Sequence, residues 1–267
     1  MTTLKVNKYG WRPDKPDARD HMFTALMPPA SLPTVVDLRP NFPTAYNQQN
    51  LGSCTANSIG AVVAFGLIKQ KILLNPGNSY MPSRLFIYYN ERVMEGTISE
   101  DAGAEIRDGI KSINTQGVCS ESEWPYIVNK FTVAPSKQCY IDALKHKSLA
   151  YQSVNQDIIS IQSCLAGGFP FSFGFTVYDS FESDAVARTG VVPMPLMTES
   201  VLGGHAVVGV GYNATMKPSM TGIPPQTFIV RNSWGPSWGK KGYCFMPFAY
   251  LTDKNLSSDF WKIIVMS

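Results

Sequence analysis

The sequence predicts an α+β protein with two lobes, one helical and one rich in β-strands. Apolar residues recur at helical spacing in the first half of the chain, whereas in the second half they alternate with small or polar residues as they do in strands. The 267 residues include 19 prolines and 21 glycines, which is typical of many turns. With 44% hydrophobic and 16% charged residues, the chain is globular and long enough to bury two modest cores.

The first 31 residues are expected to form an extended arm ahead of the main body. The stretch Trp11–Asp20 contains two prolines and charges of alternating sign, which disfavours both a helix and a central strand. The arm over residues 1–31 either packs permanently on the body or lies across a functional cleft as a short inhibitory segment.

Helices are expected to follow the arm. The longest begins at Cys54 and continues for about four turns through a segment that is apolar on most faces, so it should be buried nearly all round. Two further helices are predicted over Ser83–Met94 and Ala104–Asn114, the latter with Gly117 beyond its end, and another over Gln156–Leu165.

The strands are expected in the second half of the chain. Residues 169–177 alternate phenylalanine or valine with proline, serine, glycine or threonine, which is the period of a strand. The segments His205–Tyr212, Thr227–Arg231 and Gly242–Met246 are also predicted to be strands, separated by stretches rich in glycine and proline.

Charge and composition exclude several classes of protein. The net charge is only +3 and no dense lysine and arginine block occurs, which argues against a nucleic-acid partner. No apolar run approaches the roughly 18 residues of a membrane span. The five cysteines form no CxxC pair and the three histidines lie far from them, so no metal site is expected. No secretory leader is visible, so a reducing, cytosol-like compartment is favoured, while export by another route and a leader that has already been removed stay open.

Cys54 is the candidate nucleophile among the five thiols. A thiol attacks as the thiolate, so its site must lower a pKa that is ordinarily near 8.5. Gly52 and Ser53 form a turn-like approach, and the helical pattern begins at Cys54 itself. A thiol at a helix N-terminus is stabilised as thiolate by the helix dipole and by unpaired N–H groups.

His205 and Asn232 are the candidate partners of the cysteine. His205 follows two glycines and enters an apolar strand, which would hold its ring rigidly, although a lone histidine in such a place is more often structural. Asn232 ends another predicted strand, and its side-chain oxygen could accept the second imidazole N–H. Trp234 could shield that hydrogen bond from water.

Three segments in order resemble those of the papain and cathepsin family of cysteine peptidases. They are Asn47–Thr55, Gly204–Tyr212 and Asn232–Tyr243. Gln48 precedes Cys54 by six positions, as the family's glutamine precedes its cysteine. The histidine and asparagine follow the cysteine at somewhat greater separations than the family's roughly 130–150 residues, which an insertion explains.

The resemblance covers residues 32–267 and implies the papain-like fold. Such a fold has a helical lobe, here over about residues 45–145, and a β-barrel lobe, here over about residues 146–250, with the termini crossing between them. The active-site cleft lies between the lobes, with Cys54 and His205 on opposite walls.

The resemblance also implies the activity of a cysteine endopeptidase without a cofactor. Gln48 and the Cys54 N–H would form the oxyanion hole, and His205 would act as general acid and base. The substrates would be proteins or peptides in extended conformation. Two alternatives stay open: an acyl transferase such as a transpeptidase on the same scaffold, and a catalytically inactive papain-fold binding module.

Substrate contacts are implied around the cleft. Gly103, with Ala102 where the family usually has a second glycine, matches the strip that pairs with the substrate backbone. The pocket for the second residue before the cut would draw on Gly174, Gly203 and Ala206, whose small size predicts room for a bulky side chain. The remaining residues expected to contact substrate are Gly52, Ser53 and Trp234.

The sequence departs from the family at its disulfides. Leu51 stands where the family has a cysteine, and Thr55 where it has a tryptophan after the nucleophile. Cys139 lacks its family partner, and a Cys119–Cys139 bridge stays open. No histidine-bearing insertion resembles the exopeptidase loop of cathepsin B, which favours an endopeptidase.

Overall fold

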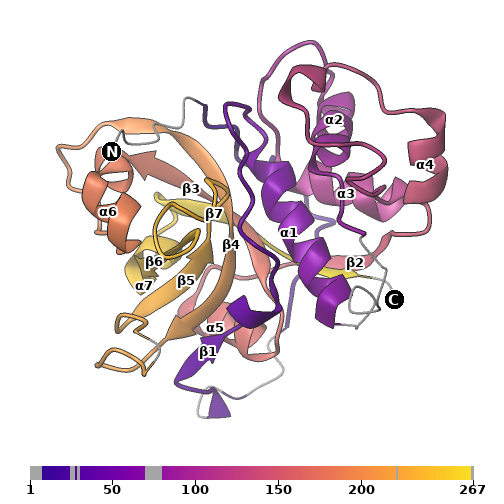
Figure 1. Ribbon diagram of the computed structural model, residues 1–267. Coiled ribbons are helices and arrows are strands. Elements are labelled where there is room, and N and C mark those ends of the chain that lie inside the picture. Colours follow the sequence, from indigo (N-terminus) through magenta and orange to yellow (C-terminus); the bar gives the residue numbers. More distant parts are fainter. Residues whose placement is uncertain (1–7, 25–27, 29–30, 70–79, 221, 266–267) are drawn as a thin grey trace.

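A computed structural model describes residues 8–24, 28, 31–69, 80–220 and 222–265. Helices gather in one half of the molecule and an antiparallel sheet forms the other (Figure 1). The arm, described over residues 8–24, crosses between the two halves beside the N-terminal end of α1 (Figure 1). The two-lobe α+β fold expected from the sequence is therefore confirmed.

The helical half is organised around a buried helix. The four helices of this half are α1 (Cys54–Lys69), α2 (Arg84–Glu95), α3 (Ile106–Gln116) and α4 (Lys137–Ala143). Helix α1 lies between α2 and α3 on one side and the sheet on the other, which is why its sequence is apolar on most faces. The predicted helices over these first three segments are confirmed.

The sheet half contains strands and four short helical segments. The strands are β1 (Val35–Asp37), β2 (Ser148–Ser153), β3 (Phe171–Tyr178), β4 (Val201–Asn213), β5 (Thr227–Arg231), β6 (Tyr243–Pro247) and β7 (Ser257–Val265). Helices α5 (Ile158–Ala166), α6 (Asp184–Thr189) and α7 (Phe248–Thr252) and the 3-10 turn η4 (Asp179–Glu182) pack beside them. Two further 3-10 turns are η2 (Arg39–Asn41) and η3 (Val128–Lys130).

The sheet is open, which corrects the expectation of a β-barrel. Its order is β2-β7-β3-β4-β5-β6, all antiparallel, and β1 adds to the end of β4. Closure would require β2 to pair with β6, and among the described residues it does not. Strand β2 instead packs toward α3 in the helical half, at the opposite end of the sheet from β6.

Hydrophobic clusters cover both faces of the sheet. One cluster joins α1, α2 and α3 to the face of β4 that carries Val208 and Val210. The other lies on the far face, where the alternating phenylalanines of β3 pack, for example Phe173 stacked on Phe260 with ring centroids 5.2 Å apart. Because β3 and β4 have packed side chains on both faces, the residues that they bring to the cleft are held rigidly.

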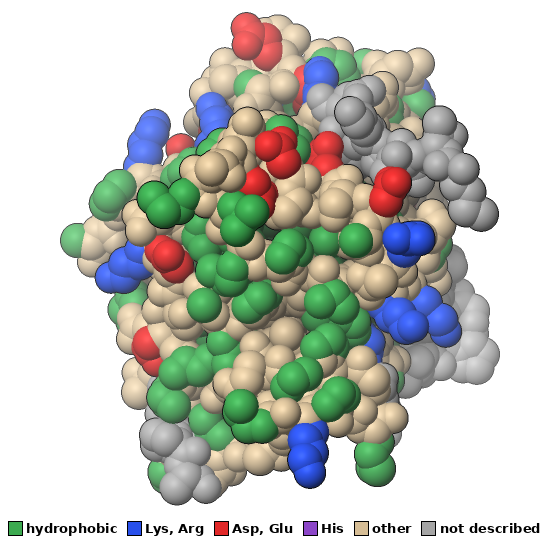
Figure 2. Space-filling model, turned by 90° about the vertical axis from the view of Figure 1, so that its left-hand side faces the viewer, with side chains coloured by type: hydrophobic (Ala, Val, Ile, Leu, Met, Phe, Trp, Pro, Cys, Tyr) green, Lys and Arg blue, Asp and Glu red, His purple; other side chains and the backbone are tan. Residues whose placement is uncertain are grey.

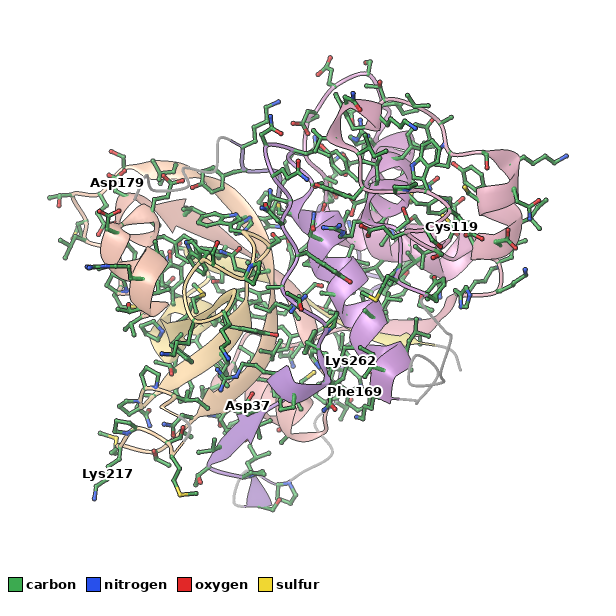
Figure 3. The ribbon with its side chains drawn as sticks, viewed as in Figure 1. Asp37, Cys119, Phe169, Asp179, Lys217 and Lys262 are labelled. Carbon is green, nitrogen blue, oxygen red and sulfur yellow. The ribbon has the colours of Figure 1, made fainter. Side chains whose placement is uncertain are left out.

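Two features stand outside the cleft, one an exposed patch and the other a buried cation. Hydrophobic side chains gather on the side of the molecule that carries α6, where Val191, Leu196, Met197 and Val201 are exposed (Figure 2). At the junction of the two halves, the Lys262 ammonium lies 3.8 Å from the centre of the Phe169 ring (Figure 3). In the part of the chain that the structure describes, no helix has both the length and the apolar character needed to span a membrane.

Candidate active site

Cys54 is the first residue of α1 and is fully buried. The backbone N–H groups of Ala206, Gly10 and Thr55 point toward its thiol. Gly52, two residues earlier, donates its N–H to Asp101 at 3.0 Å, which fixes the turn before the helix. The thiol thus sits at a helix N-terminus among several backbone donors, as the sequence predicted.

His205 lies on β4, and its ring is oriented by Asn232. The imidazole Nε2 and the Asn232 Oδ1 are 2.8 Å apart, and both residues are buried. The Ser233 N–H donates to the same Oδ1 at 2.7 Å, which orients the amide. The other ring nitrogen, Nδ1, is buried and has no hydrogen-bond partner among the described residues. Trp234 covers the imidazole with ring centroids 5.2 Å apart, so it shields the Nε2 hydrogen bond.

Gln48 is buried beside the turn at Gly52 and Ser53 that precedes the candidate nucleophile Cys54, here called the nucleophile turn. Its side-chain Nε2 donates to the Leu51 carbonyl at 3.0 Å, and its Oε1 accepts from the Ser233 hydroxyl at 2.7 Å. Each amide nitrogen carries two hydrogens, so one donor of Gln48 remains for a ligand. The structure therefore brings together the four residues that the family motifs single out, which are Gln48, Cys54, His205 and Asn232.

The N-terminal arm fills the cleft above these residues. The Trp11 N–H donates to the Gly204 carbonyl at 3.0 Å, and the Ala104 N–H donates to the Gly10 carbonyl at 2.7 Å. A Cβ on Gly10 would lie 1.8 Å from the Gly52 carbonyl oxygen, so only glycine fits this close to the nucleophile turn. The arm thus pairs with both walls of the cleft through its backbone.

Trp11 occupies the pocket for which the sequence predicted room. A Cβ on Gly174 would lie 1.9 Å from the Trp11 ring, and one on Gly204 would lie 2.7 Å from it. The indole N–H donates to Asp259 at 3.1 Å. Ala206 faces Gly174 across the strand pair and directs its N–H at Cys54. The small residues therefore do accommodate a large aromatic side chain.

Tyr9 lies over Gly203, next to the His205 ring. Its own ring centroid is 6.2 Å from that of His205 and 6.3 Å from that of Trp234. Its hydroxyl donates to the Glu182 carboxylate. Gly203, which the sequence assigned to the same pocket as Gly174, therefore contacts a different side chain of the arm.

Backbone pairing on the helical wall is made by Ala104 and not by its two predecessors. Ala104 donates to Gly10 and accepts from the Arg12 N–H at 3.1 Å. Gly103 supplies the close approach, because a Cβ there would lie 2.1 Å from the Gly10 oxygen. No backbone hydrogen bond joins Ala102 to the described arm. Ala104 could not be singled out from sequence, since any residue can offer its backbone.

Ser53 faces away from the arm. Its hydroxyl is 2.6 Å from the Tyr126 hydroxyl and 3.1 Å from the Asn57 amide nitrogen, on the helical side of the turn. Its side chain therefore supports the turn from behind. The five cysteines are free thiols, so the bridge between Cys119 and Cys139 is not formed.

Burial works against ionisation of Cys54 and His205 while the arm is in place. It raises the pKa of Cys54 to about 12, although the nearby N–H groups oppose the shift. It lowers the pKa of His205 to about 4, with the Asn232 hydrogen bond acting in the opposite direction. Gly10 and Tyr9 contribute to this burial because they lie directly on the two groups. The covered site therefore favours a neutral thiol and a neutral imidazole.

An acidic cluster anchors the arm beyond Trp11. Asp259 accepts from the Asp14 N–H at 2.8 Å as well as from Trp11. The Asp14 carboxylate accepts from the Trp261 indole at 2.6 Å and from the Arg107 N–H at 3.1 Å. Burial first, and the charge of Asp259 second, raise the pKa of Asp14 to about 7. The docked arm can therefore hold a proton that a solvated aspartate would release.

Comparison with known proteins gives a consistent result. The model of the papain family cysteine proteases matches residues 32–255. An uncharacterised peptidase C1-like protein of Acanthamoeba polyphaga mimivirus is 43% identical over 289 aligned positions, covering 98% of this chain and 89% of the relative. Xylellain, a cysteine protease from Xylella fastidiosa, is 40% identical over the full length of both chains, with a TM-score of 0.88.

A more distant structure shares the fold alone. A procathepsin B from Trypanosoma congolense superposes with a TM-score of 0.74 at 16% identity, covering 98% of this chain and 88% of that one.

Proposed function

This chain belongs to the papain family of cysteine proteases, and we propose that it is an endopeptidase with Cys54 as nucleophile and His205 as general acid and base. The observation that carries the proposal is the His205 ring. Asn232 holds Nε2 at 2.8 Å, while Nδ1 is buried and has no hydrogen-bond partner in the part of the chain that the structure describes. The next residue on the same strand, Ala206, directs its N–H at the Cys54 thiol. This arrangement leaves Nδ1 free to exchange a proton with Cys54.

The proposed reaction has two half-reactions, the formation of a thioester on Cys54 and its hydrolysis. The Cys54 thiolate attacks the peptide carbonyl, and the oxyanion accepts hydrogen bonds from Gln48 and from the Cys54 N–H. The His205 imidazolium then protonates the leaving amine, giving a thioester. In the second half-reaction His205 takes a proton from water, which attacks the thioester and releases the acid.

The path of the arm supports internal cleavage. Residues 9–12 pass over the nucleophile, and the described chain continues from there past Asp14 to Thr24, while Lys8 on the other side pairs with Asp101 at 2.8 Å. A polypeptide thus has room on both sides of Cys54. An exopeptidase instead needs a group that stops the substrate chain beside the nucleophile.

We therefore expect hydrolysis of a peptide blocked at both ends. An internally quenched peptide with an acetylated N-terminus and an amidated C-terminus, carrying an aromatic residue two positions before the cut, should be cleaved about as fast as its unblocked counterpart. Cleavage only of the unblocked peptide would contradict the endopeptidase assignment. Accumulation of a peptide–amine conjugate instead of the free acid would show that the enzyme is a transferase.

We also propose that residues 8–24 inhibit the enzyme without being cut. The Gly10 carbonyl accepts from the Ala104 N–H, and Gly10 presents Cys54 with its own N–H group. No arm carbonyl is hydrogen-bonded to Gln48 among the described residues. The arm therefore occupies the cleft without offering a carbonyl to the oxyanion hole.

Inhibition by the arm should weaken as the pH rises. Asp14 has a pKa of about 7 when docked and an ordinary value of about 3.9 when released, so the docked state holds the extra proton. Between about pH 4 and about pH 7 the Asp14 carboxyl is ionised in the released arm and protonated in the docked arm, so a rise in pH favours release. Above about pH 7 it is ionised in both states, and release gains nothing more. Asp259, whose pKa burial also raises, acts in the same direction, whereas Arg107, paired with Asp20, opposes it.

The ratio of the rate of the full chain to that of the Trp11→Ala variant measures this effect, because the pH dependence of the released enzyme divides out. The released thiolate–imidazolium pair and the docked neutral thiol and imidazole hold the same number of protons, so their exchange on docking adds no pH dependence of its own. The ratio should rise between pH 4 and pH 7 and then level off. In Asp14→Asn the rise should be reduced or absent. A ratio that falls with pH would contradict the account.

A further inference from the structure

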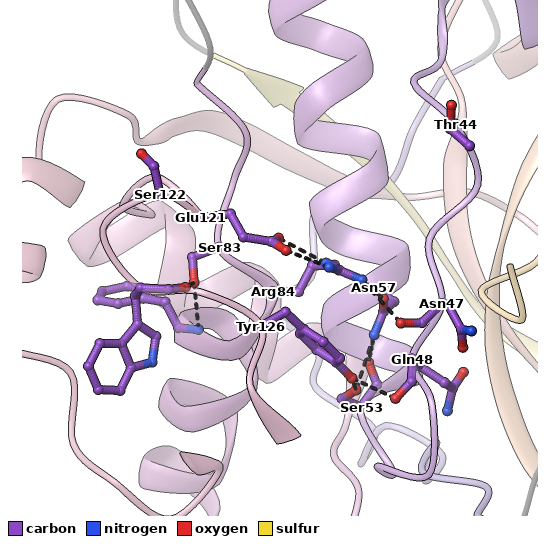
Figure 4. Close-up of polar contacts among 12 residues, drawn as sticks. Thr44, Asn47, Gln48, Ser53, Asn57, Ser83, Arg84, Glu121, Ser122 and Tyr126 are labelled. Atoms are coloured by element: carbon purple, nitrogen blue, oxygen red, sulfur yellow. Dashed lines mark hydrogen bonds and ion pairs between the residues drawn. The ribbon is translucent and has the colours of Figure 1, made fainter. Parts of the chain in front are cut away.

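Arg84 is a buried cation behind the nucleophile turn. It begins α2 and is 8% exposed. Its guanidinium binds Glu121 in a fork, with Nε 2.9 Å from Oε2 and a second nitrogen on Oε1 (Figure 4). The rings of Tyr46 and Tyr126 lie on it, with their centroids 4.4 Å and 4.1 Å from the guanidinium carbon. Arg84 is therefore fixed in both position and orientation.

Arg84 reaches the nucleophile turn through Asn57. It donates to the Asn57 Oδ1 at 3.1 Å, so the Asn57 Nδ2 must point the other way. That nitrogen donates to the Ser53 carbonyl at 2.9 Å and to the Ser53 hydroxyl at 3.1 Å. The Ser53 carbonyl and the Cys54 N–H belong to one planar peptide unit, so fixing the carbonyl fixes the direction of the N–H.

A second connection runs through Tyr126 to Gln48. The Tyr126 ring packs on the Arg84 guanidinium, and its hydroxyl donates to the Gln48 carbonyl at 2.8 Å while lying 2.6 Å from the Ser53 hydroxyl (Figure 4). Arg84 also donates to the Asn47 carbonyl at 3.4 Å. The Gln48 backbone is thus connected to Arg84, both through Tyr126 and through the neighbouring residue Asn47.

We infer that Arg84 is a positioning residue that aims both donors of the proposed oxyanion hole, the Cys54 N–H and the Gln48 side chain. This inference rests on the proposed function. An oxyanion donor acts only when it is aimed at the position that the oxygen takes in the transition state, and small misplacements are costly. Arg84 touches neither the thiol nor the imidazole, so its loss should spare both.

Arg84→Lys tests the inference, because a lysine keeps the charge but loses the fork to Glu121 and the bond to Asn57. We measure kcat, KM and the pH dependence of Cys54 alkylation by iodoacetamide, all in the Trp11→Ala chain. We expect kcat to fall by about 10- to 100-fold with KM changed by less than about threefold. Alkylation should keep its rate and its pH profile, since it forms no oxyanion.

Three further variants separate positioning from general damage. Arg39→Lys is the matched control, because Arg39 also forms a carboxylate fork, with Asp37, and stacks on Tyr243, away from the cleft; its kcat should not change. Tyr126→Phe keeps the ring and removes the hydroxyl that bridges Gln48 and Ser53, so it should repeat the loss in kcat if Arg84→Lys fails to fold. In a chain that already carries Gln48→Ala, Arg84→Lys should cost much less than it does alone.

The outcomes are distinct. A fall in kcat with unchanged alkylation, and a reduced effect beside Gln48→Ala, supports the inference. An unchanged kcat in both Arg84→Lys and Tyr126→Phe overturns it, as does a parallel loss of kcat and alkylation. Absence of peptide hydrolysis in the Trp11→Ala chain itself would count against the proposed function and not against the role of Arg84 alone.

Discussion

Replacing Cys54 with serine abolishes peptide hydrolysis, with kcat reduced by about 10⁴-fold or more. A hydroxyl is a far weaker nucleophile than a thiolate, and His205 is placed to exchange a proton with a thiol. The variant should fold normally, because Cys54 is fully buried at a helix terminus and serine is similar in size. Steady-state assays with a blocked peptide, together with thermal unfolding, measure the two effects.

Cys164→Ser is the control for that substitution. Cys164 is also buried, and its thiol lies 3.4 Å from the Phe169 carbonyl, a contact that a serine hydroxyl can keep. The control should retain full activity. Activity that survives Cys54→Ser and is lost in Cys164→Ser would place the nucleophile elsewhere.

Replacing Trp11 with alanine raises the rate of peptide hydrolysis by the full chain. The substitution removes a buried indole and its hydrogen bond to Asp259, which together should weaken docking of the arm by about 3 kcal/mol or more, or roughly 100-fold. The rate rises by this full factor only if the arm of the unsubstituted chain is docked nearly all of the time. Initial rates of the two chains at the same concentration provide the measurement.

Phe23→Ala separates inhibition from stability. Phe23 belongs to the same arm but packs in the cluster on the far face of the sheet, away from Cys54. Its loss should lower the unfolding temperature and raise the rate much less than Trp11→Ala does. If both variants only lose stability and neither gains activity, the arm is a structural strap and not an inhibitor.

The proposed catalytic residues could be selected as candidates from the sequence because each lies in a short segment whose neighbours determine its geometry. Cys54 follows a turn and begins an apolar helix, and Asn232 directly follows the last residue of β5. His205 could be proposed as a partner of Cys54 only from its order with the other motifs, since a single histidine on an apolar strand is more often structural. The structure adds the distance that order cannot give, 2.8 Å between His205 and Asn232.

Long-range pairing could not be predicted. Strand β7 joins β2, some hundred residues earlier, and β3, yet it begins with three polar residues, Ser257–Asp259, that hide it from a search for alternation. Asp259 has a φ of 58°, a conformation that residues other than glycine rarely adopt, at the point where its carboxylate accepts from Trp11. Strand β7 also connects β2 to β3 within a sheet that is open, whereas the sequence analysis expected a closed barrel.

The position of the arm depends on surfaces that the sequence does not reveal. Trp11 stands in a polar stretch with prolines, and nothing local indicates that its ring fits against Gly174. The contact depends on Gly174 and Gly204, which lie on different strands and lack the Cβ atoms that would collide with the Trp11 ring. The aromatic side chain of Trp11, standing directly before a polar stretch with two prolines, is the available signal.

The central claim, a cysteine nucleophile covered by its own N-terminal arm, is tested most directly by a peptide vinyl sulfone. Mass spectrometry of the labelled protein identifies the modified thiol and gives the rate of labelling. We expect modification of Cys54 alone among the five cysteines, slow in the full chain and faster in Trp11→Ala. Labelling of another cysteine, or equal rates in the two chains, would contradict the account.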